Sequence, residues 1–369
     1  MERNKILTIT IALVLIASAV GIYWYCNNDD EQYDLIVACG TKNCYEPFWV
    51  ADHFGFFDDE DVNVQMMYVD GGGSATTALL AGQVDMTLVG ADPAIRLFDK
   101  TTDGMTIATI ETSLGSDSVD FAALSKYNVD LTSPAASLLN SDGKTVRIHC
   151  GMDITTGYYS GYISYLYSAY QAGELTKDQY ELLKTVKTDT QDGGIVNISF
   201  ENQLIALLQD TVQMLCSGST VAMASQYQEV TALSSPYESA VGCCVIIVSG
   251  NAIAEKSDAI TKALKALDKA CAFIENDETK LQAAEYCVEF YGSSTWTVES
   301  QMTFFNTQYW DICYMLGLED YLNLKAGLLE YDNFDCSDRI TQDFLIAVHD
   351  GADYAYDTEQ NKIVSNSLI

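Results

Sequence analysis

The chain has 369 residues, with a hydrophobic content of 48% and a charged content of 19%. That length is too great for one compact core and suits two lobes, and the composition is that of a folded protein. The formal net charge of -33 excludes nucleic acid and anionic lipid headgroups as partners, because binding either of them requires a basic face. The acidity predicts a solvated, self-repelling surface.

The first predicted element is long enough to cross a membrane. Residues 6–25 are uncharged and mostly aliphatic, and a helix of that length spans the hydrocarbon layer of ~30 Å. Arg3 and Lys5 precede this run, and acidic residues follow it. The positive-inside bias therefore leaves the N-terminus in the cytoplasm and the body on the outer face of the cytoplasmic membrane.

Residues 1–26 are predicted to be an N-terminal membrane anchor or signal segment. Tyr23, Trp24 and Tyr25 stand where a signal peptide needs small residues for cleavage. An uncleaved anchor is therefore favoured over a lipoprotein modified at Cys26, and both readings stay open. Because only five residues precede Ile6, we expect no cytoplasmic output domain on that side.

Strand-to-helix units follow the anchor in chain order. Strands are predicted at residues 35–38, 62–69, 86–89, 145–150 and 241–248. Helices are predicted to begin at Pro47, Ser74, Asp92 and Thr155, and further helices at residues 260–274, 281–291 and 299–316. Repeated units of this kind indicate sheets with parallel strands covered by helices.

One helix-turn-strand unit occurs twice. Residues 78–91, ALLAGQVDMTLVGA, align with residues 206–219, ALLQDTVQMLCSGS, through shared Ala, Leu, Val, Met and Gly positions. The second copy has Asp210 for Gly82 and Gln213 for Asp85. The match supports one such unit in each lobe.

The cysteines and histidines predict no metal site. An exported chain with eleven cysteines is a candidate for disulfides, and connectivity cannot be read from spacing. Cys243 and Cys244 fall in an apolar stretch and are predicted to pack inertly. The three histidines are too scattered for a ligand set. The candidate disulfides are Cys39 with Cys44, or pairs drawn from Cys271, Cys287, Cys313 and Cys336.

Residues 44–94, CYEPFWVADHFGFFDDEDVNVQMMYVDGGGSATTALLAGQVDMTLVGADPA, resemble the periplasmic binding proteins for aliphatic sulfonates, taurine and nitrate. The likeness covers most of residues 33–316. It rests on the motif residues Tyr45, Pro47, Gly55, Phe56, Phe57, Gly72, Gly73, Leu79, Gly82, Val84, Asp85, Gly90 and Pro93.

This resemblance implies an α/β, two-lobed, type II periplasmic-binding-protein-like fold, with mixed sheets covered by helices and a ligand cleft between the lobes. Residues 34–116 would form the first part of lobe 1, residues 117–236 lobe 2, and residues 237–369 the return to lobe 1 with C-terminal helices. The chain would cross between lobes near Ser116 and Tyr237. Ligands of open α/β sheets also bind at strand ends.

Carried over by position, the resemblance implies a binding site without a catalytic residue. Its members would be Tyr45, Gly72, Gly73, Gly90, Asp92, Asp153, Thr155, Thr156, Gln226 and Tyr227. Helix N-termini at Ser74, Asp92 and Thr155 favour an anionic group. None of the four arginines lies in these loops, and the late segment ASQYQEV lacks the proline usual in the family, so a zwitterion or neutral heterocycle stays open.

The predicted function is an extracytoplasmic solute-binding protein of an ABC importer for a sulfonate, taurine or nitrate-like anion. Its partners would be the permease and ATPase subunits, and we expect a monomer without a cofactor. One alternative is a binder of a thiamine-pyrimidine precursor, and another is a ligand-sensing domain. A pyrimidine-synthase-like enzyme is disfavoured because the CCCFC motif of those iron-dependent synthases is missing, and no hydrolase or P-loop signature occurs.

Overall fold

The computed structural model describes residues 33–41, 44–113, 121–236, 242–292, 296–313, 318–331, 333–341, 343–348, 354–357 and 362–365. The predicted anchor at residues 1–26 and the predicted lobe crossings near Ser116 and Tyr237 lie outside these ranges. The chain from Leu35 onward forms one compact unit. None of the helices in the described ranges is long and apolar enough to cross a bilayer.

The first sheet has six strands in the order β11-β4-β10-β3-β1-β2. Its strands are β1 (Leu35–Gly40), β2 (Val64–Val69), β3 (Met86–Gly90), β4 (Met105–Ser113), β10 (Gly242–Val248) and β11 (Gln308–Cys313). β1 runs parallel to β2 and β3, whereas β10 is antiparallel to β3 and β4. The sheet is therefore mixed, as expected.

The second sheet has five strands in the order β7-β6-β8-β5-β9. This is the arrangement of β2-β1-β3-β10-β4 in the first sheet, read from its β2 edge. They are β5 (Phe121–Leu124), β6 (Cys150–Met152), β7 (Ile195–Asn197), β8 (Met214–Cys216) and β9 (Val230–Leu233). β6 is parallel to β7 and β8, and β5 is antiparallel to β8 and β9. The chain moves to this sheet between β4 and β5 and leaves it between β9 and β10.

Side chains that alternate along each strand bury both faces of the first sheet. Val37 and Cys39 belong to the cluster that contains α2 (Glu46–His53) and α12 (Ser257–Glu275). Ala38 belongs instead to the cluster of α4 (Gly71–Leu80), α5 (Ala91–Lys100) and α15 (Leu318–Leu328). Because successive side chains point to opposite faces, one strand serves two helical layers.

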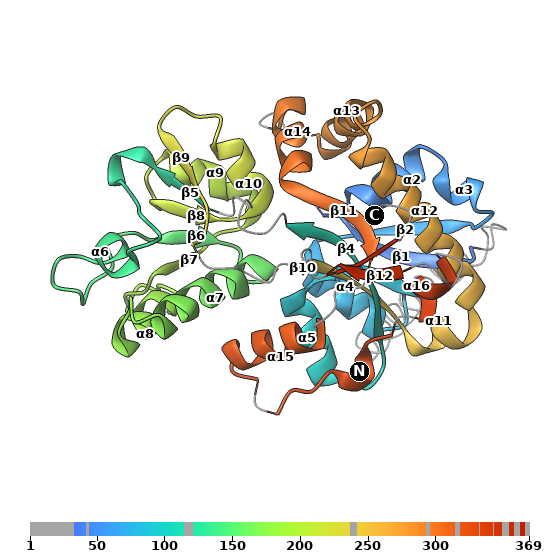
Figure 1. The fold of residues 1–369 in the computed structure, drawn as a ribbon, viewed down its shortest axis with the longest axis horizontal. Helices are drawn as coiled ribbons and strands as arrows, with labels where there is room; N and C mark the ends of the chain where they lie inside the picture. Colours follow the sequence, from blue (N-terminus) through green and yellow to red (C-terminus); the bar gives the residue numbers. More distant parts are fainter. Residues whose placement is uncertain are drawn as a thin grey trace, which may run out of the picture. The chain divides into compact units, whose positions relative to one another are not determined.

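The second sheet is buried in the same way. Phe121 and Ala123 pack with α7 (Gly157–Gln171) and α8 (Lys177–Lys184), while Ala122 and Leu124 pack with α9 (Phe200–Leu208) and α10 (Gly218–Ala224). Figure 1 shows the two helical pairs on either side of β5 to β9. The other elements are α3 (Phe56–Asp59), η2 (Ser125–Tyr127), α6 (Pro134–Leu138), α11 (Gly250–Glu255), α13 (Lys280–Tyr291), α14 (Val298–Thr307), η3 (Ser337–Arg339), α16 (Asp343–Val348), β12 (Tyr354–Asp357) and β13 (Lys362–Ser365).

Two predicted elements are wrong. The strand expected at residues 145–150 begins only at Cys150, because Asp142 accepts the backbone N–H of Lys144 and Thr145 and so holds a turn. The helix expected at residues 299–316 ends at Thr307, and the chain continues as β11. The N–H of Trp310 donates to the Glu275 carboxylate at 2.8 Å, and the Trp310 side chain is buried.

The predicted repeat is confirmed as α4-turn-β3 in one sheet and α9-turn-β8 in the other. Gly82 and Asp210 both adopt the left-handed conformation, with φ of 66° and 59°. Asp85 accepts the N–H of Ile36 at 2.8 Å, and Gln213 accepts the N–H of His149 at 3.1 Å. The aligned residues thus perform the same structural tasks.

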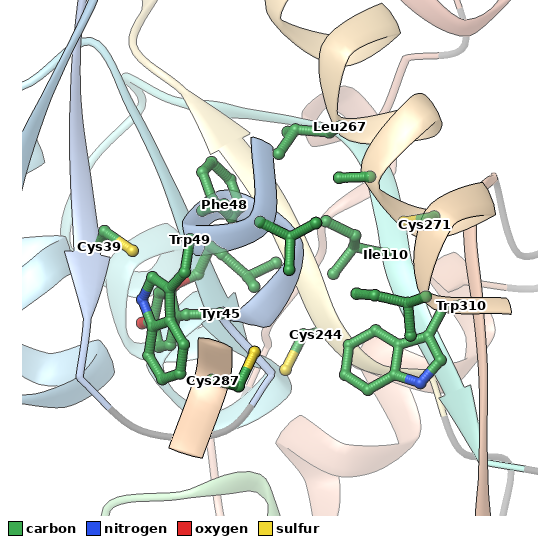
Figure 2. Packing of buried hydrophobic residues seen from close by; sticks show 14 of the residues in the cluster. Cys39, Tyr45, Phe48, Trp49, Ile110, Cys244, Leu267, Cys271, Cys287 and Trp310 are labelled. Carbon is green, nitrogen blue, oxygen red and sulfur yellow. The ribbon is translucent and has the colours of Figure 1, made fainter. Parts of the chain in front are cut away.

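The predicted disulfides are wrong, because all six candidate cysteines are free thiols. Figure 2 shows Cys39, Cys244, Cys271 and Cys287 among aromatic and aliphatic side chains of the core. Burial raises the pKa of the thiols of Cys39, Cys271 and Cys287 well above the ordinary value. Cys244 is buried, so inert packing is confirmed for this residue, whereas the side chain of Cys243 is outside the described part.

Candidate functional site

The loops after β1, β2 and β3 lie at the same edge of the first sheet, because these strands are parallel. Tyr45 is only 4% exposed, and its hydroxyl donates to the carbonyl of Leu88 at 2.6 Å. Its ring packs so closely against Gly40 that a side chain there would collide with it. The structure therefore uses Tyr45 to fix the first loop on β3.

The glycines predicted after β2 bring two helices together. A Cβ atom at Gly72 would lie 2.8 Å from Cγ of Pro93, so the absence of a side chain lets α4 approach α5. Gly73 has open space around it. α4 begins at Gly71 after Asp70, and the expected N-cap at Ser74 is wrong because the helix already includes all three glycines.

Asp153, Thr155 and Thr156 form a self-bonded loop before α7. The Thr155 hydroxyl donates to the Asp153 carboxylate at 2.6 Å, and the Thr156 hydroxyl donates to the Asp153 carbonyl at 2.7 Å. Thr156, rather than Thr155, is the N-cap, and α7 starts at Gly157. Asp153 is thus occupied by its own loop, and both hydroxyls keep only acceptor capacity.

Asp92 is a fully buried carboxylate in the first turn of α5, where Gly90 is the N-cap. Neither carboxylate oxygen has a partner with hydrogen-bond geometry, although Ser160 lies close enough to favour the charged form. Burial raises the pKa of Asp92, and the neighbouring Ser160, Lys325 and Arg96 oppose that rise. Ser160 is in the first turn of α7, and its hydroxyl donates to the Gly157 carbonyl at 3.1 Å. The beginnings of α5 and α7 therefore meet at an unsatisfied carboxylate.

The turn between β8 and α10 supplies a second set of unsatisfied polar atoms, which the sequence reasoning missed. Ser217 and Thr220 are fully buried, and neither hydroxyl has a partner. Between them, Gly218 lies directly against the hydroxyl of Tyr158 in the first turn of α7, and near the ring of Phe304 in α14. The repeat contained the signal, because Thr220 aligns with Asp92 when Gly218 is placed on Gly90.

The last two predicted site residues follow α10. The Gln226 amide donates to the Ser300 hydroxyl of α14 at 2.8 Å. Tyr227 is 37% exposed and comes after the C-terminal end of α10, whereas Gly218 begins that helix. The structure brings Gln226 to α14 but does not bring Tyr227 to the unsatisfied cluster.

We group Asp92, Ser160, Ser217, Gly218 and Thr220 as the site cluster, because α7 packs against both α5 and β8, and Gly218 lies against Tyr158 of α7. The positive ends of α5 and α7 favour an anionic group, and the Ser217 and Thr220 hydroxyls can donate to it. The Asp92 carboxylate is suited to a cation or a donor. Among the described residues, no group of three His, Cys, Asp or Glu side chains is placed to hold a metal ion.

Comparisons with known proteins agree with this architecture. The family model described as NMT1/THI5 like matches residues 44–147. No curated protein sequence matches the chain. Several solved structures share its fold at low sequence identity, and three of them illustrate the range.

The periplasmic aliphatic sulphonate binding protein SsuA from Escherichia coli has a TM-score of 0.63 and 12% identity, covering 84% of this chain and 92% of its own. The periplasmic nitrate-binding protein NrtA from Synechocystis PCC 6803 has a TM-score of 0.60 and 10% identity, covering 89% and 90%. The CA3427 gene product of Candida albicans, described as having the generic periplasmic binding protein fold, has a TM-score of 0.53 and 15% identity, covering 84% and 96%.

These similarities confirm the expected fold class. Two mixed sheets covered by helices, with the same strand order in each, are found in this chain and match the architecture of the neighbours. Residues 44–147 are thus similar to the NMT1/THI5 like family model, and the chain has the type II periplasmic-binding-protein fold.

Proposed function

We propose that the chain is the extracytoplasmic solute-binding component of an ABC importer, and that it captures a small anion by closure of two lobes. The observation that carries this proposal is the site cluster, in which buried polar atoms without partners come from helices of both sheets. Leaving such atoms unsatisfied costs about 1–3 kcal/mol each. A ligand that bonds to them recovers that free energy.

The lobes would be residues 34–116 with 237–369 for lobe 1, and residues 117–236 for lobe 2. The change of sheet between β4 and β5, and its reversal between β9 and β10, supports this division. Closure would select the liganded population in proportion to the difference in affinity between the open and closed states. The permease and ATPase subunits are the proposed partners, and residues 1–26 would hold a monomer at the outer face of the membrane.

The ligand we propose first is a sulfonate-like or nitrate-like oxyanion. The first turns of α5 and α7 offer positive dipole ends, and Ser217 and Thr220 offer buried hydroxyl donors. The neighbours SsuA and NrtA bind a sulfonate and nitrate by their descriptions. Tyr45, Gly72, Gly73, Gly90, Asp153, Thr155, Thr156, Gln226 and Tyr227 remain proposed members of the surrounding site.

A second candidate is a zwitterion such as taurine, which carries an amine as well as a sulfonate. Asp92 favours it, because a buried carboxylate without a hydrogen-bond partner is suited to a ligand ammonium group. The hydroxyl side of the cluster would then take the sulfonate. The two candidates differ only in whether Asp92 contacts the ligand.

Thermal unfolding of the full-length chain in detergent, with nitrate, methanesulfonate or taurine added, tests the proposal. A specific ligand at a hundred times its dissociation constant adds ~2.7 kcal/mol to the free energy of unfolding. A higher unfolding midpoint with at least one of these compounds is the expected result. A midpoint unmoved by all three would overturn the proposed ligand class.

Two aligned substitutions then separate the candidates. Thr220→Val removes a hydroxyl at the position equivalent to Asp92, and we expect weaker binding of every anion by about tenfold. Asp92→Asn should weaken taurine binding by about a hundredfold if its amine contacts Asp92, and should leave methanesulfonate binding intact. Equal losses for both compounds would remove the zwitterion candidate. Calorimetric titration measures both.

A further inference from the structure

A cavity of about 370 Å³ lies between α5, α7, α8 and the end of α15. Two of its lining residues, Arg96 and Tyr159, are electrostatic neighbours of Asp92 in the site cluster. None of Ser217, Gly218 and Thr220 lines it. α15 packs on both α5 and α7, and Figure 1 shows it beside α5. This volume is within the usual range for a site that holds a small organic molecule.

Arg96 gives the cavity a guanidinium group that the protein hardly uses. Its one hydrogen bond is a long contact of 3.4 Å to the carbonyl of Ile154, and no ion pair with a carboxylate forms within the described ranges. By contrast, Arg147 and Arg339 bond firmly to backbone carbonyls. Arg96 therefore keeps most of its donors for another group, and a guanidinium matches a carboxylate or sulfonate best.

Lys184 supplies a second cation on the wall of the cavity. Its ammonium lies 3.1 Å from both Glu181 and Glu330, and those two side chains are largely exposed. Ion pairs with such exposed carboxylates contribute little to stability, so their partners are easily replaced. Lys184 is thus able to turn toward an anion in the cavity at small cost.

The end of α15 forms part of the cavity wall. Glu330 adopts a left-handed conformation with φ of 63°, and the N–H of Tyr331 donates to the Ala326 carbonyl at 2.9 Å. This is the bonding of a Schellman motif, which usually has glycine where Glu330 stands. This position places the Glu330 carboxylate beside Lys184, and Glu330 and Tyr331 both line the cavity.

The remaining wall residues are aromatic and aliphatic, apart from Thr185. Leu328 at the end of α15 and the next residue, Leu329, line the cavity together with Tyr331, and Tyr159 lines it from α7. The electrostatic neighbours of Tyr159 are Asp92, Lys184, Arg96 and Glu330, so the charged and aromatic groups share one environment that borders the site cluster. This combination suits a flat apolar body that carries one negative charge.

We propose that this cavity is a second binding site, which takes a small aromatic or branched aliphatic carboxylate or sulfonate. The anionic group contacts Arg96 and Lys184, and the apolar body lies between Tyr159, Tyr331 and the leucines. Because the walls come from helices of both sheets and from α15, occupancy favours the arrangement in which these helices are packed together. The site does not depend on the ligand proposed for the site cluster.

Calorimetric titration of the full-length chain with benzoate and benzenesulfonate tests the proposal, with benzamide as the uncharged probe. We expect binding of at least one anion and much weaker binding of benzamide. Arg96→Gln should lower the anion affinity by about tenfold or more, and Arg96→Lys should restore part of it. Lys126→Gln is the matched control, because Lys126 is an exposed cation that pairs with Asp210 elsewhere.

A second variant separates this proposal from the importer function. Ser217→Ala alters the hydroxyl side of the site cluster and should leave benzoate binding unchanged. Lys184→Gln, in the cavity wall, should weaken benzoate binding and leave methanesulfonate binding unchanged. Absence of binding of both aromatic anions at millimolar concentration would overturn the proposal. Loss of benzoate binding in Ser217→Ala, with no loss in Arg96→Gln, would also overturn it by placing benzoate in the other site.

Discussion

The two sheets carry the same helix-turn-strand unit, yet they bury different chemistry around it. Among the described residues, the fully buried polar atoms without partners on the side of the first sheet include the carboxylates of Glu46 and Asp92. On the side of the second sheet such atoms are neutral, and they belong to Tyr162, Gln203, Ser217 and Thr220. Both sheets therefore bury polar atoms that have no hydrogen-bond partner, and the residue type at each position determines whether these atoms can carry a charge.

Because of this contrast, we expect the pH dependence of the free energy of unfolding to come from the first sheet. A buried neutral hydroxyl does not titrate in the ordinary range, whereas a buried carboxylate must lose a proton in an apolar place. Gln301 donates to one Glu46 oxygen at 3.4 Å, and the other oxygen has no partner. Burial is the main reason that the pKa of Glu46 rises to about 8.

The largest expected effect is thus on stability between pH 4.5 and pH 8. The folded chain keeps the Glu46 proton up to about pH 8, while the unfolded chain releases it near its ordinary pKa of 4.5. The folded state therefore binds more protons across this window, and the free energy of unfolding falls as pH rises, by several kcal/mol at about 1.4 kcal/mol per unit. Denaturant titrations at a series of pH values measure this slope.

Glu46→Gln should flatten most of that slope, since the amide keeps the shape of the side chain without an ionisable proton. Asp92, whose pKa burial also raises, and Asp268, whose pKa burial raises to about 6, should account for the smaller slope that remains. An unchanged pH profile in Glu46→Gln would show that the Glu46 carboxylate is not the source.

The next largest effect on the free energy of unfolding is expected at Asp85 and Gln213, the two hydrogen-bond acceptors that align in the repeat. Asp85 accepts the N–H of Ile36 and also pairs with the ammonium of Lys256 at 2.8 Å, whereas Gln213 makes neutral hydrogen bonds to His149. Asp85→Ala should lower the free energy of unfolding by about 3 kcal/mol, and Gln213→Ala by about 1 kcal/mol. Chemical denaturation of both variants gives these values.

Asp85→Asn serves as the intermediate case, because it keeps an acceptor for Ile36 and loses the charge. Its loss should fall between those of the two alanine variants. Equal losses at the two aligned positions would mean that the Lys256 pair contributes nothing, and that the two units are energetically alike.

Much of this architecture follows from sequence patterns. Alternation and apolar runs predict β1, β2, β3 and β10, since each strand packs against helices on both faces. β11 was not predicted, because its residues continue the helical pattern of the preceding segment. They form a strand because they pair with β4. The turn at Asp142 was missed for a similar reason, because its side-chain bonds compete with strand pairing.

The candidate site was only partly predictable. Glycines and Asp92 were found through a family likeness, and the structure places Asp92 beside α7. Tyr45 also has a packing role, because its hydroxyl donates to the Leu88 carbonyl, 43 positions away on β3. Thr220 was overlooked although it aligns with Asp92, since nothing in a hydroxyl residue marks it as buried and unsatisfied until tertiary packing removes water from it.

The smallest expected effect concerns the left-handed residue of each turn. Gly82→Ala places a Cβ in a conformation with φ of 66°, and should lower the free energy of unfolding by about 1 kcal/mol. Asp210 has the same left-handed conformation in the second unit. Its carboxylate accepts from the Lys126 ammonium at 2.7 Å and from the Tyr127 hydroxyl at 2.9 Å. These local bonds offset the strain.

Asp210→Gly should therefore change stability by less than about 0.5 kcal/mol, because the relief of strain and the loss of exposed bonds nearly cancel. Asp210→Ala retains the strain and loses the bonds, so it should lower the free energy of unfolding by about 1 kcal/mol, more than Asp210→Gly does. Denaturation midpoints of the three variants order them. If Asp210→Ala and Asp210→Gly had equal stability, the left-handed conformation would have no energetic cost at this turn. The two units would then be alike in their hydrogen bonds only.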